Sequence, residues 1–434
     1  MQQRTHAENI YRAAVAAVQP AALLPQHLHL KGNELLIGDQ SLSIASADVY
    51  IIGAGKAAAA MAQTAESILG AHIKAGIVTT KYDHALALEK IKCIEAAHPV
   101  PDEKSVEAVQ QTINLLKQTK ANDIIICLLS GGASSLWADT PAGISLTELQ
   151  KTFDLLLKSG ASIDEMNCVR RHLSQIKGGQ ILRYAPQANW FTVIISDVPG
   201  DSITDVASGP TSADATTFAD AMNLINKYQL KDQLPTPVLQ YLKKGMNGEV
   251  NDSIKPGDPL LKHVSNSIIG SNKTAVTAAK QKAEELGYAV IAQEELLTGE
   301  TADAANYIIQ KVTQQQPGKP TCLLFGGETT VTVKGKGKGG RNQQLALCAL
   351  QQLNNQPNVT LLAAGTDGTD GPTDAAGAFA HHNLVKAAEE QKLSISDAIN
   401  NNDAYPFFEK VNGLLKTGAT QTNVMDIVIV LIDK

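Results

Sequence analysis

The segment VYIIGAGKAAAAMA, residues 49–62, indicates how the chain folds. Residues 49–52 are apolar and partly β-branched, which predicts a short buried strand. A tight turn at Gly53 and Gly55 follows, and then an alanine-rich run that strongly favours helix. Lys56 therefore lies at a helix N-terminus, where the helix dipole disfavours a cation. A lysine in this position suggests that its side chain and the free backbone N–H groups share an anionic ligand.

The same pattern recurs along the chain. Five further apolar runs end in loops rich in Gly, Ser, Asp or Asn, at residues 124–135, 191–201, 267–274, 322–330 and 360–371. Helical patterns separate most of them, and this alternation predicts α/β layers with a largely parallel sheet. Because ligands of such sheets bind beyond the carboxyl ends of the strands, we expect the functional site in these loops.

Length and composition predict two globular domains. The 434 residues exceed one ordinary core, and the chain is 44% hydrophobic and 18% charged. Proline and glycine are frequent between residues 231 and 265. We therefore predict an N-terminal domain at 1–240, a linker at 241–259 and a C-terminal domain at 260–434.

Charge and cysteine content narrow the partners and the location. The net charge of −6 argues against a nucleic-acid or anionic-membrane partner. The five cysteines are scattered, as expected for reduced thiols. The sequence shows no apolar signal segment and no run of membrane-spanning length, so we expect a cytoplasmic protein.

Three segments of the N-terminal half are candidate ligand sites. The SGGASS loop, residues 130–135, combines backbone N–H groups and hydroxyls that suit a carboxylate or phosphate, although a plain turn or a nucleophilic serine is an alternative. Residues 170–179 add Arg170, Arg171 and Lys177, or else form a solvated basic face. Asp197 directly follows an apolar run and could hold Mg²⁺, accept a proton or cap its loop.

The C-terminal half contains a glycine–lysine segment and an acidic loop. Residues 326–342 read as a strand at 328–333, then glycines interleaved with lysines, and then Arg341 at a helix start. Such cations suit phosphates, although a flexible solvated loop would explain the lysines as well. Asp367 and Asp370 follow the run at 360–365 and could hold Mg²⁺ beside phosphate oxygens, or simply cap a glycine-rich turn.

Seven motifs in this order resemble one known family. GAGKAAAAMA, LLSGGASSL, VRRHLSQIKGG, SDVPGD with SGPT, GGETTVTVKGKGKGGRNQ, AAGTDGTDGPTDAAGA and TGATQTNV together resemble the glycerate 2-kinase family, whose C-terminal part is the MOFRL domain. The resemblance implies two α/β domains, the first a Rossmann-like three-layer sandwich, with the active site in the cleft between them. It also implies a kinase that uses ATP and Mg²⁺ to phosphorylate the 2-hydroxyl of D-glycerate, giving 2-phosphoglycerate and ADP.

The resemblance places the catalytic lysine at Lys56 and the catalytic arginine at Arg341. We expect both cations beside the γ-phosphoryl group, Asp197 beside the glycerate hydroxyl, and Mg²⁺ at Asp367 and Asp370. Because positions 56 and 341 lie on either side of the predicted linker, domain closure should assemble the site. The candidate substrate- and phosphate-binding residues are Gly53, Gly55, Ser130, Gly131, Gly132, Ser134, Arg170, Lys177, Asn272, Glu328 and Gly340.

Two other functions compete with the kinase. An NAD(P)H-dependent hydroxypyruvate reductase needs a third glycine where Ala58 stands, and an acidic residue near position 80, where the sequence reads Thr79-Thr80-Lys81. A non-catalytic sugar-phosphate or nucleotide sensor would not need the carboxylates of Asp367 and Asp370. We expect glycerate and ATP as small-molecule partners, no nucleic acid and no membrane, and we keep a homodimer as a hypothesis.

Overall fold

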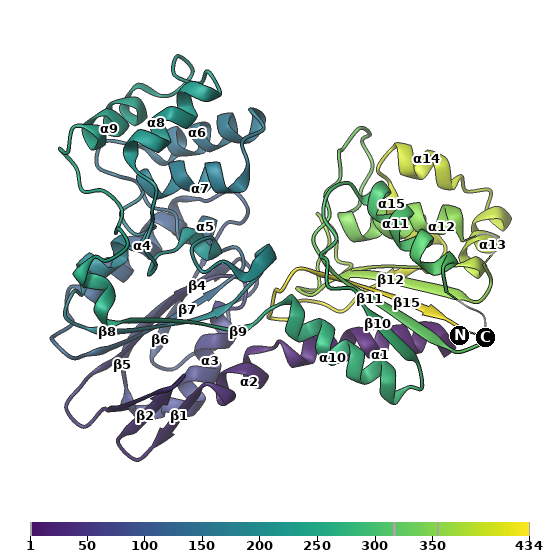
Figure 1. The fold of residues 1–434 in the computed structure, drawn as a ribbon, viewed down its shortest axis with the longest axis horizontal. Helices are drawn as coiled ribbons and strands as arrows, with labels where there is room; N and C mark the ends of the chain where they lie inside the picture. The colour runs from purple at the N-terminus through teal and green to yellow at the C-terminus, as the bar shows by residue number, and fades with distance from the viewer. Residues whose placement is uncertain (1, 316–317, 354–355, 434) are drawn as a thin grey trace. The chain divides into compact units, whose positions relative to one another are not determined.

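The computed structural model describes residues 2–315, 318–353 and 356–433. It forms two compact units, and the colour in Figure 1 follows the chain through both of them from the N-terminus to the C-terminus. Leu23–Ile269 form one unit, called here the parallel-sheet unit. Met1–Ala22 together with Gly270–Lys434 form the other, called the mixed-sheet unit. Among the described residues, no helix combines the length and the apolar character needed to cross a bilayer.

The parallel-sheet unit is built on a six-stranded sheet. The strands occur in the spatial order β6 (Ile91–Ala96), β5 (Ile73–Lys81), β4 (Val49–Ala54), β7 (Ile124–Ser130), β8 (Asn189–Ile195) and β9 (Val264–Gly270). The pairs from β6 through β8 are all parallel. Counted along the chain from β4, the order is 3-2-1-4-5-6, which is that of a Rossmann fold. The predicted Rossmann-like fold is therefore confirmed for this unit.

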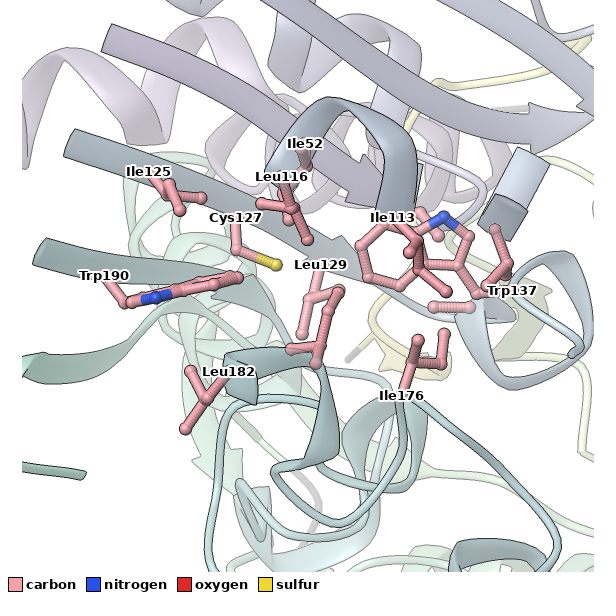
Figure 2. Packing of buried hydrophobic residues seen from close by; sticks show 14 of the residues in the cluster. Ile52, Ile113, Leu116, Ile125, Cys127, Leu129, Trp137, Ile176, Leu182 and Trp190 are labelled. Carbon is pink, nitrogen blue, oxygen red and sulfur yellow. The ribbon is translucent and has the colours of Figure 1, made fainter. Parts of the chain in front are cut away.

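The core of this unit lies on both faces of the sheet. Every residue of β4 is buried, as expected for a central parallel strand covered on both sides. Helix α4 (Glu103–Leu116) packs Ile113 and Leu116 against the face that carries Ile52, and Figure 2 shows this cluster with Trp137 and Trp190. Helix α3 (Ala58–Leu69) covers the opposite face in Figure 1, completing three layers.

A cluster of helices with its own apolar core, called here the helical cap, belongs to the same unit. It lies above the sheet in Figure 1. Three of its helices begin with capping boxes, which fix their N-termini. The cap comprises α6 (Leu146–Lys158), α7 (Ile163–His172), α8 (Phe218–Lys227) and α9 (Thr236–Met246). The unit also contains the short helix α5 (Ala133–Leu136) and an antiparallel sheet of β1 (Leu28–Lys31), β2 (Glu34–Ile37) and β3 (Gln40–Ser43).

The mixed-sheet unit has a sheet of different topology. Its spatial order is β10 (Ala289–Ala292), β11 (Thr321–Gly327), β15 (Asp426–Ile432), β12 (Val359–Gly365), β13 (Gly377–His381) and β14 (Leu414–Leu415). Among the described strands of this sheet, β10 and β11 pair in parallel, and the other neighbouring pairs are antiparallel. The prediction of a largely parallel sheet is thus wrong for this unit, because the last strand inserts antiparallel between β11 and β12.

Helices cover both faces of the mixed sheet (Figure 1). One face carries α1 (Gln2–Ala17) and α10 (Asn272–Glu285), and α11 (Thr301–Thr313) and α12 (Arg341–Gln352) lie on the other. The remaining helices are α2 (Pro20–Leu23), α13 (His382–Glu390), α14 (Ile395–Asn400) and α15 (Ala404–Lys410). The predicted strand at 328–333 is not formed, since Thr330 makes only an isolated bridge to Glu300.

The boundaries of the two units differ from the predicted domains, 1–240 and 260–434. The predicted linker, 241–259, contains the end of α9, and Ile254 is fully buried with its N–H bonded to the Gly178 carbonyl. Its prolines and glycines therefore make turns within a packed unit. The first 22 residues belong with the C-terminal part, where the buried Tyr11 hydroxyl donates to the Gly365 carbonyl.

Candidate functional site

In the parallel-sheet unit, the loops after β4 and β7 meet at the point where the strand order reverses. This is where ligands bind in open α/β sheets. The Lys56 N–H donates to the Gly131 carbonyl (2.9 Å), and the Ala57 N–H donates to Oγ of the fully buried Ser130 (3.0 Å). The Ser130 hydroxyl thus satisfies an N–H group at the start of α3 and holds Lys56 at the carboxyl edge of the sheet.

The predicted glycines of these loops are explained by close packing. Gly55 has a φ of +136°, and a Cβ there would collide with Ser130. Gly53 lies within β4, where a Cβ would meet the Leu128 carbonyl. Gly132 is left-handed, with φ +84°. These residues let the two loops approach each other, which brings the predicted residues of both loops together.

A cavity of about 840 Å³ lies beside these loops, within the parallel-sheet unit. Helices α6 and α7 of the helical cap supply an apolar wall that includes Leu149, Phe153 and Met166. Polar and charged groups also line it, among them Ser134, Arg170, Asp139 and Lys177. An apolar cavity with a few convergent polar groups is typical of small-molecule sites.

Ser134 is fixed by a chain of hydrogen bonds. Its hydroxyl lies 3.0 Å from that of Ser208, which in turn donates to Asn167 Oδ1 (3.0 Å). Because the Ser208 proton points to Asn167, Ser134 is the donor to Ser208. Ser208 itself has a left-handed backbone, with φ +58°. The backbone N–H groups of the loop, rather than the Ser134 hydroxyl, are therefore the natural donors to an anion.

The basic residues of segment 170–179 divide into two kinds. Arg170 lines the cavity, and its guanidinium stacks over the Phe153 ring at 5.3 Å. Arg171 is instead buried and forms ion pairs with Asp205 (3.0 Å) and Asp214 (3.1 Å), so its role is structural. The alternative of a solvated basic face is therefore wrong for Arg171.

Lys177 reaches the cavity from a buried position. Its ammonium group donates to the Trp137 carbonyl (2.7 Å). Burial lowers the pKa of Lys177 to about 8, although the nearby Asp139 opposes the shift. Burial also raises the pKa of Asp139. Asp197 lies in the loop after β8, at the same carboxyl edge as Lys56, and is half-buried.

In the mixed-sheet unit, two carboxylates hold Arg341 at the start of α12. The guanidinium donates from Nε and Nη2 to the two oxygens of Asp426 (2.5 and 2.9 Å), and Nη1 lies 2.7 Å from Glu328 Oε1. Burial alone would lower the pKa of Arg341, but Asp426 and Glu328 outweigh it and raise the pKa. About a third of the side chain, 34%, stays exposed, so the fixed guanidinium is accessible to an anion.

Asp426 is a site residue that sequence reasoning missed. It begins β15 and pairs in register with Gly327 at the end of β11 and with Gly365 at the end of β12. Because β15 runs antiparallel to both neighbours, its first residue lies at their carboxyl edge. The available signal was a lone carboxylate at the start of an apolar strand, in the stretch VMDIVIVLI.

The two predicted metal carboxylates have different surroundings. Asp370 is buried, and its oxygens accept from the N–H groups of Asn342 (3.1 Å) and Gln343 (2.8 Å) at the start of α12. Burial raises its pKa to about 6 despite these bonds. Asp367 is half-buried, and its Oδ1 accepts from Thr369 N–H (3.0 Å). Asp370 therefore caps a helix, whereas Asp367 accepts from an N–H group of its own loop.

Two further predicted residues support the strand ends. The Asn272 amide, at the start of α10, donates to the carbonyls of Val424 and Asp426, both at 2.9 Å. Gly340 precedes α12, and a Cβ there would collide with Asp370. In the part of the chain that is described, no three His, Cys, Asp or Glu side chains form a metal-binding group. The donors present fit Mg²⁺ that arrives with phosphate oxygens, since Mg²⁺ commonly takes only one or two protein carboxylates.

A Rossmann-type sheet with a glycine- and serine-rich loop at its carboxyl edge, together with a second unit that presents a fixed guanidinium, defines a two-unit α/β enzyme architecture. The chain matches two families over these parts: the Domain of unknown function (DUF4147) at residues 6–243, and the MOFRL family at residues 321–426.

Relatives identify the family. A glycerate 2-kinase of Pyrococcus horikoshii is 38% identical over 96% of this chain and 95% of its own length. A solved glycerate kinase structure from Thermotoga maritima superposes with a TM-score of 0.85 at 36% identity, covering 99% of each chain. A relative from Agrobacterium vitis with a provisional hydroxypyruvate reductase name is 36% identical over 88% of this chain and 98% of its own length. The chain belongs to the glycerate 2-kinase family.

Proposed function

We propose that this protein is a glycerate 2-kinase that transfers the γ-phosphoryl group of ATP to the 2-hydroxyl of D-glycerate, giving 2-phosphoglycerate and ADP. The observation that carries the proposal is the guanidinium of Arg341, which Asp426 and Glu328 hold at a helix N-terminus with part of its surface exposed. The kinase names of the Pyrococcus and Thermotoga relatives supply the substrate and the reaction.

The chemistry asks the protein mainly for positioning and electrostatic stabilisation. Lys56 and Arg341 belong to different units, and we propose that both act on one γ-phosphoryl group when the units close on the substrates. The planar fork of Arg341 would contact two phosphoryl oxygens, and Lys56 would neutralise charge that develops in the transition state. Because its guanidinium is already held in place, Arg341 would need little reorganisation during the reaction.

The acceptor would bind at the loop after β7. The carboxylate of glycerate would accept hydrogen bonds from backbone N–H groups of residues 131–134, with the Arg170 guanidinium as the nearby cation of the cavity. Asp197, at the same edge of the sheet, is the candidate to orient the 2-hydroxyl or to accept its proton. The proton would leave the hydroxyl oxygen as that oxygen bonds to phosphorus.

Mg²⁺ would accompany ATP and be held by Asp367, with phosphate oxygens as further ligands. When bound, the ion would neutralise charge on the phosphate chain. Asp370 remains the second candidate ligand, although backbone N–H groups of α12 already engage its oxygens.

We further propose a cytoplasmic location, because all five cysteines are free thiols and four of them are buried. A homodimer remains a hypothesis, which a direct measurement of the mass in solution would test.

One assay tests the proposed function. The purified protein is incubated with D-glycerate, ATP and Mg²⁺, and the product is resolved as 2-phosphoglycerate or 3-phosphoglycerate by ³¹P NMR. We expect 2-phosphoglycerate, formed only when all three components are present. Formation of 3-phosphoglycerate, or ATP hydrolysis that is independent of glycerate, would contradict the proposal.

The name of the Agrobacterium relative favours the alternative hypothesis of a hydroxypyruvate reductase. The strand next to β4, however, ends in Thr79, Thr80 and Lys81, where NAD-binding folds carry an acidic residue for the ribose. Oxidation of NADH by hydroxypyruvate, at a rate that matches the kinase rate, is the result that would favour the reductase.

A further inference from the structure

The lysines that precede Arg341 form an ordered cationic surface. Lys334, Lys336 and Lys338, called here the lysine strip, are exposed and alternate with glycines. Among the described residues, no carboxylate lies within ion-pair distance of their ammonium groups, in a chain of net charge −6. The interpretation of a flexible solvated loop does not fit the hydrogen bonds of this segment.

The backbone of the strip is held by three consecutive residues, Asn401, Asn402 and Asp403, called here the NND turn. They bind five successive N–H groups of residues 334–338. The acceptors are Asn402 Oδ1 for residues 334 and 335 (2.8 and 3.0 Å), Asn401 Oδ1 for 336 (3.1 Å), the Asn401 carbonyl for 337 (2.9 Å) and Asp403 Oδ1 for 338 (2.9 Å). The segment is therefore a fixed platform rather than a mobile tether.

The glycines and the lysines face opposite ways on this platform. A Cβ on Gly335 or Gly337 would collide with or crowd the backbone of Asn401, so both glycines lie against the NND turn. The alternating lysines consequently face solvent. The ammonium group of Lys338 also lies over the Tyr405 ring at 4.7 Å, which restrains one end of the strip.

The position of the strip indicates its ligand. Only Gly339 and Gly340 separate Lys338 from Arg341, and three residues of chain span at most about 10 Å. A densely charged anion held by the strip can therefore extend to the fixed guanidinium. We propose that the lysine strip binds the phosphate chain of the nucleoside triphosphate and that the NND turn positions it, an inference that rests on the proposed kinase function.

Steady-state kinetics and direct binding test this role. Lys336→Gln removes one exposed charge and should raise the KM for ATP about fivefold, with little change in kcat or in the KM for glycerate. Asn402→Gly keeps the left-handed backbone at that position (φ +53°) and removes only the amide, so it should raise the ATP KM in the same direction with all lysines intact. Lys386→Gln, an exposed lysine of α13 in the same unit, is the matched control and should change neither constant.

Ionic strength and a second probe complete the experiment. The effect of Lys336→Gln should shrink as salt rises, because exposed charges are screened. An unchanged ATP KM at low salt, or a raised KM for glycerate alone, would overturn the assignment. If the wild-type protein phosphorylates no glycerate, the proposed function fails, and displacement of a fluorescent ATP analogue by tripolyphosphate still tests the strip. Equal tripolyphosphate affinity in wild type and Lys336→Gln would then reject it, and so would tighter binding of polyglutamate than of tripolyphosphate.

Discussion

The two sheets bring polar groups to their ligand edges in different ways. In the parallel sheet, β4 and β7 both end at the candidate site, where they place loop backbone, the buried Ser130 hydroxyl and Lys56. In the mixed sheet, β15 runs the other way, so its first residue, Asp426, lies beside the last residues of β11 and β12.

This difference decides how each cation is held. The backbone N–H of Lys56 is anchored to the Gly131 carbonyl of the neighbouring loop. Arg341 has its guanidinium itself fixed, by a bidentate pair with Asp426 and a third contact to Glu328. The antiparallel strand β15 thus supplies the carboxylate that orients the arginine.

The largest expected effect comes from the parallel-sheet side of the comparison. Lys56→Ala should lower kcat about 10³-fold, because in the proposed mechanism it removes the cation that stabilises transition-state charge. The thermal midpoint should change little, since the start of α3 loses a charge that its dipole disfavours. Steady-state kinetics and thermal unfolding measure both, with the exposed Lys90→Ala as the control. An unchanged kcat would remove Lys56 from the mechanism.

The next effect tests the antiparallel strand. Asp426→Asn keeps the size of the side chain but loosens the bidentate hold on Arg341, and we expect kcat to fall about 10²-fold, since misplacement of a catalytic group by about 1 Å costs that much. Glu328→Gln should cost less, because Glu328 contacts a single nitrogen.

Arg341→Lys is the companion variant for the same point. It keeps the charge and removes the planar fork, so it should resemble Asp426→Asn in kcat. Near-normal activity in either variant would mean that the orientation of the guanidinium does not matter to the reaction.

Much of the parallel-sheet unit was predictable from sequence because its signals are local. An apolar run that ends in a glycine-rich loop predicts both the strand and the loop after it, and VYIIGAGK and IIICLLSGG behave in this way at β4 and β7. The pairing of those two loops follows from the strand order of the fold.

The mixed-sheet unit was less predictable because an apolar run indicates a strand but not the direction in which that strand pairs. The run at 426–432 could pair in either direction, and only tertiary packing places Asp426 beside Arg341. The unit boundaries were missed for a related reason. Proline and glycine between 231 and 265 indicate turns, but they do not tell whether a turn lies inside a packed unit.

A third prediction separates the two loop carboxylates of the mixed-sheet unit. Asp367→Asn should raise the Mg²⁺ concentration for half-maximal activity about tenfold, because it removes the carboxylate that we propose as a ligand, and Mg²⁺ takes few charged ligands from protein. Asp370→Asn should leave that concentration near the wild-type value, because an asparagine also caps a helix N-terminus.

Activity titrated with Mg²⁺ at fixed ATP measures both variants. Burial raises the pKa of the Asp370 carboxyl to about 6, and the amide oxygen of Asp370→Asn keeps one of the two acceptors that serve the N–H groups at the start of α12. A higher Mg²⁺ requirement in Asp370→Asn than in Asp367→Asn would reverse the assignment.

The smallest effect on activity, and one confined to stability, concerns an ion pair between a buried histidine and a half-buried aspartate, which holds none of the candidate catalytic groups. In the parallel-sheet unit, His172 lies 2.9 Å from Asp252 and 2.7 Å from the Cys168 carbonyl, so both ring nitrogens donate and the imidazole is charged. Burial alone would lower the pKa of His172, but these hydrogen bonds outweigh it and raise the pKa from 6.5 to about 9. The pair therefore stabilises the fold fully below about pH 6.5 and loses that contribution as the pH rises through about 9.

His172→Gln should accordingly lower the free energy of unfolding by about 2 kcal/mol at pH 6 and by less at pH 10, while kcat stays unchanged. Urea unfolding at the two pH values measures the difference, with the exposed His29→Gln as the control. A loss of equal size at both pH values would show that packing against Phe218, and not the charge of the imidazolium, is what His172 contributes. A fall in kcat would instead show that the His172–Asp252 pair contributes to activity. The distinction between this pair, which stabilises the fold, and the Asp426–Arg341 pair, which orients a candidate catalytic group, would then be lost.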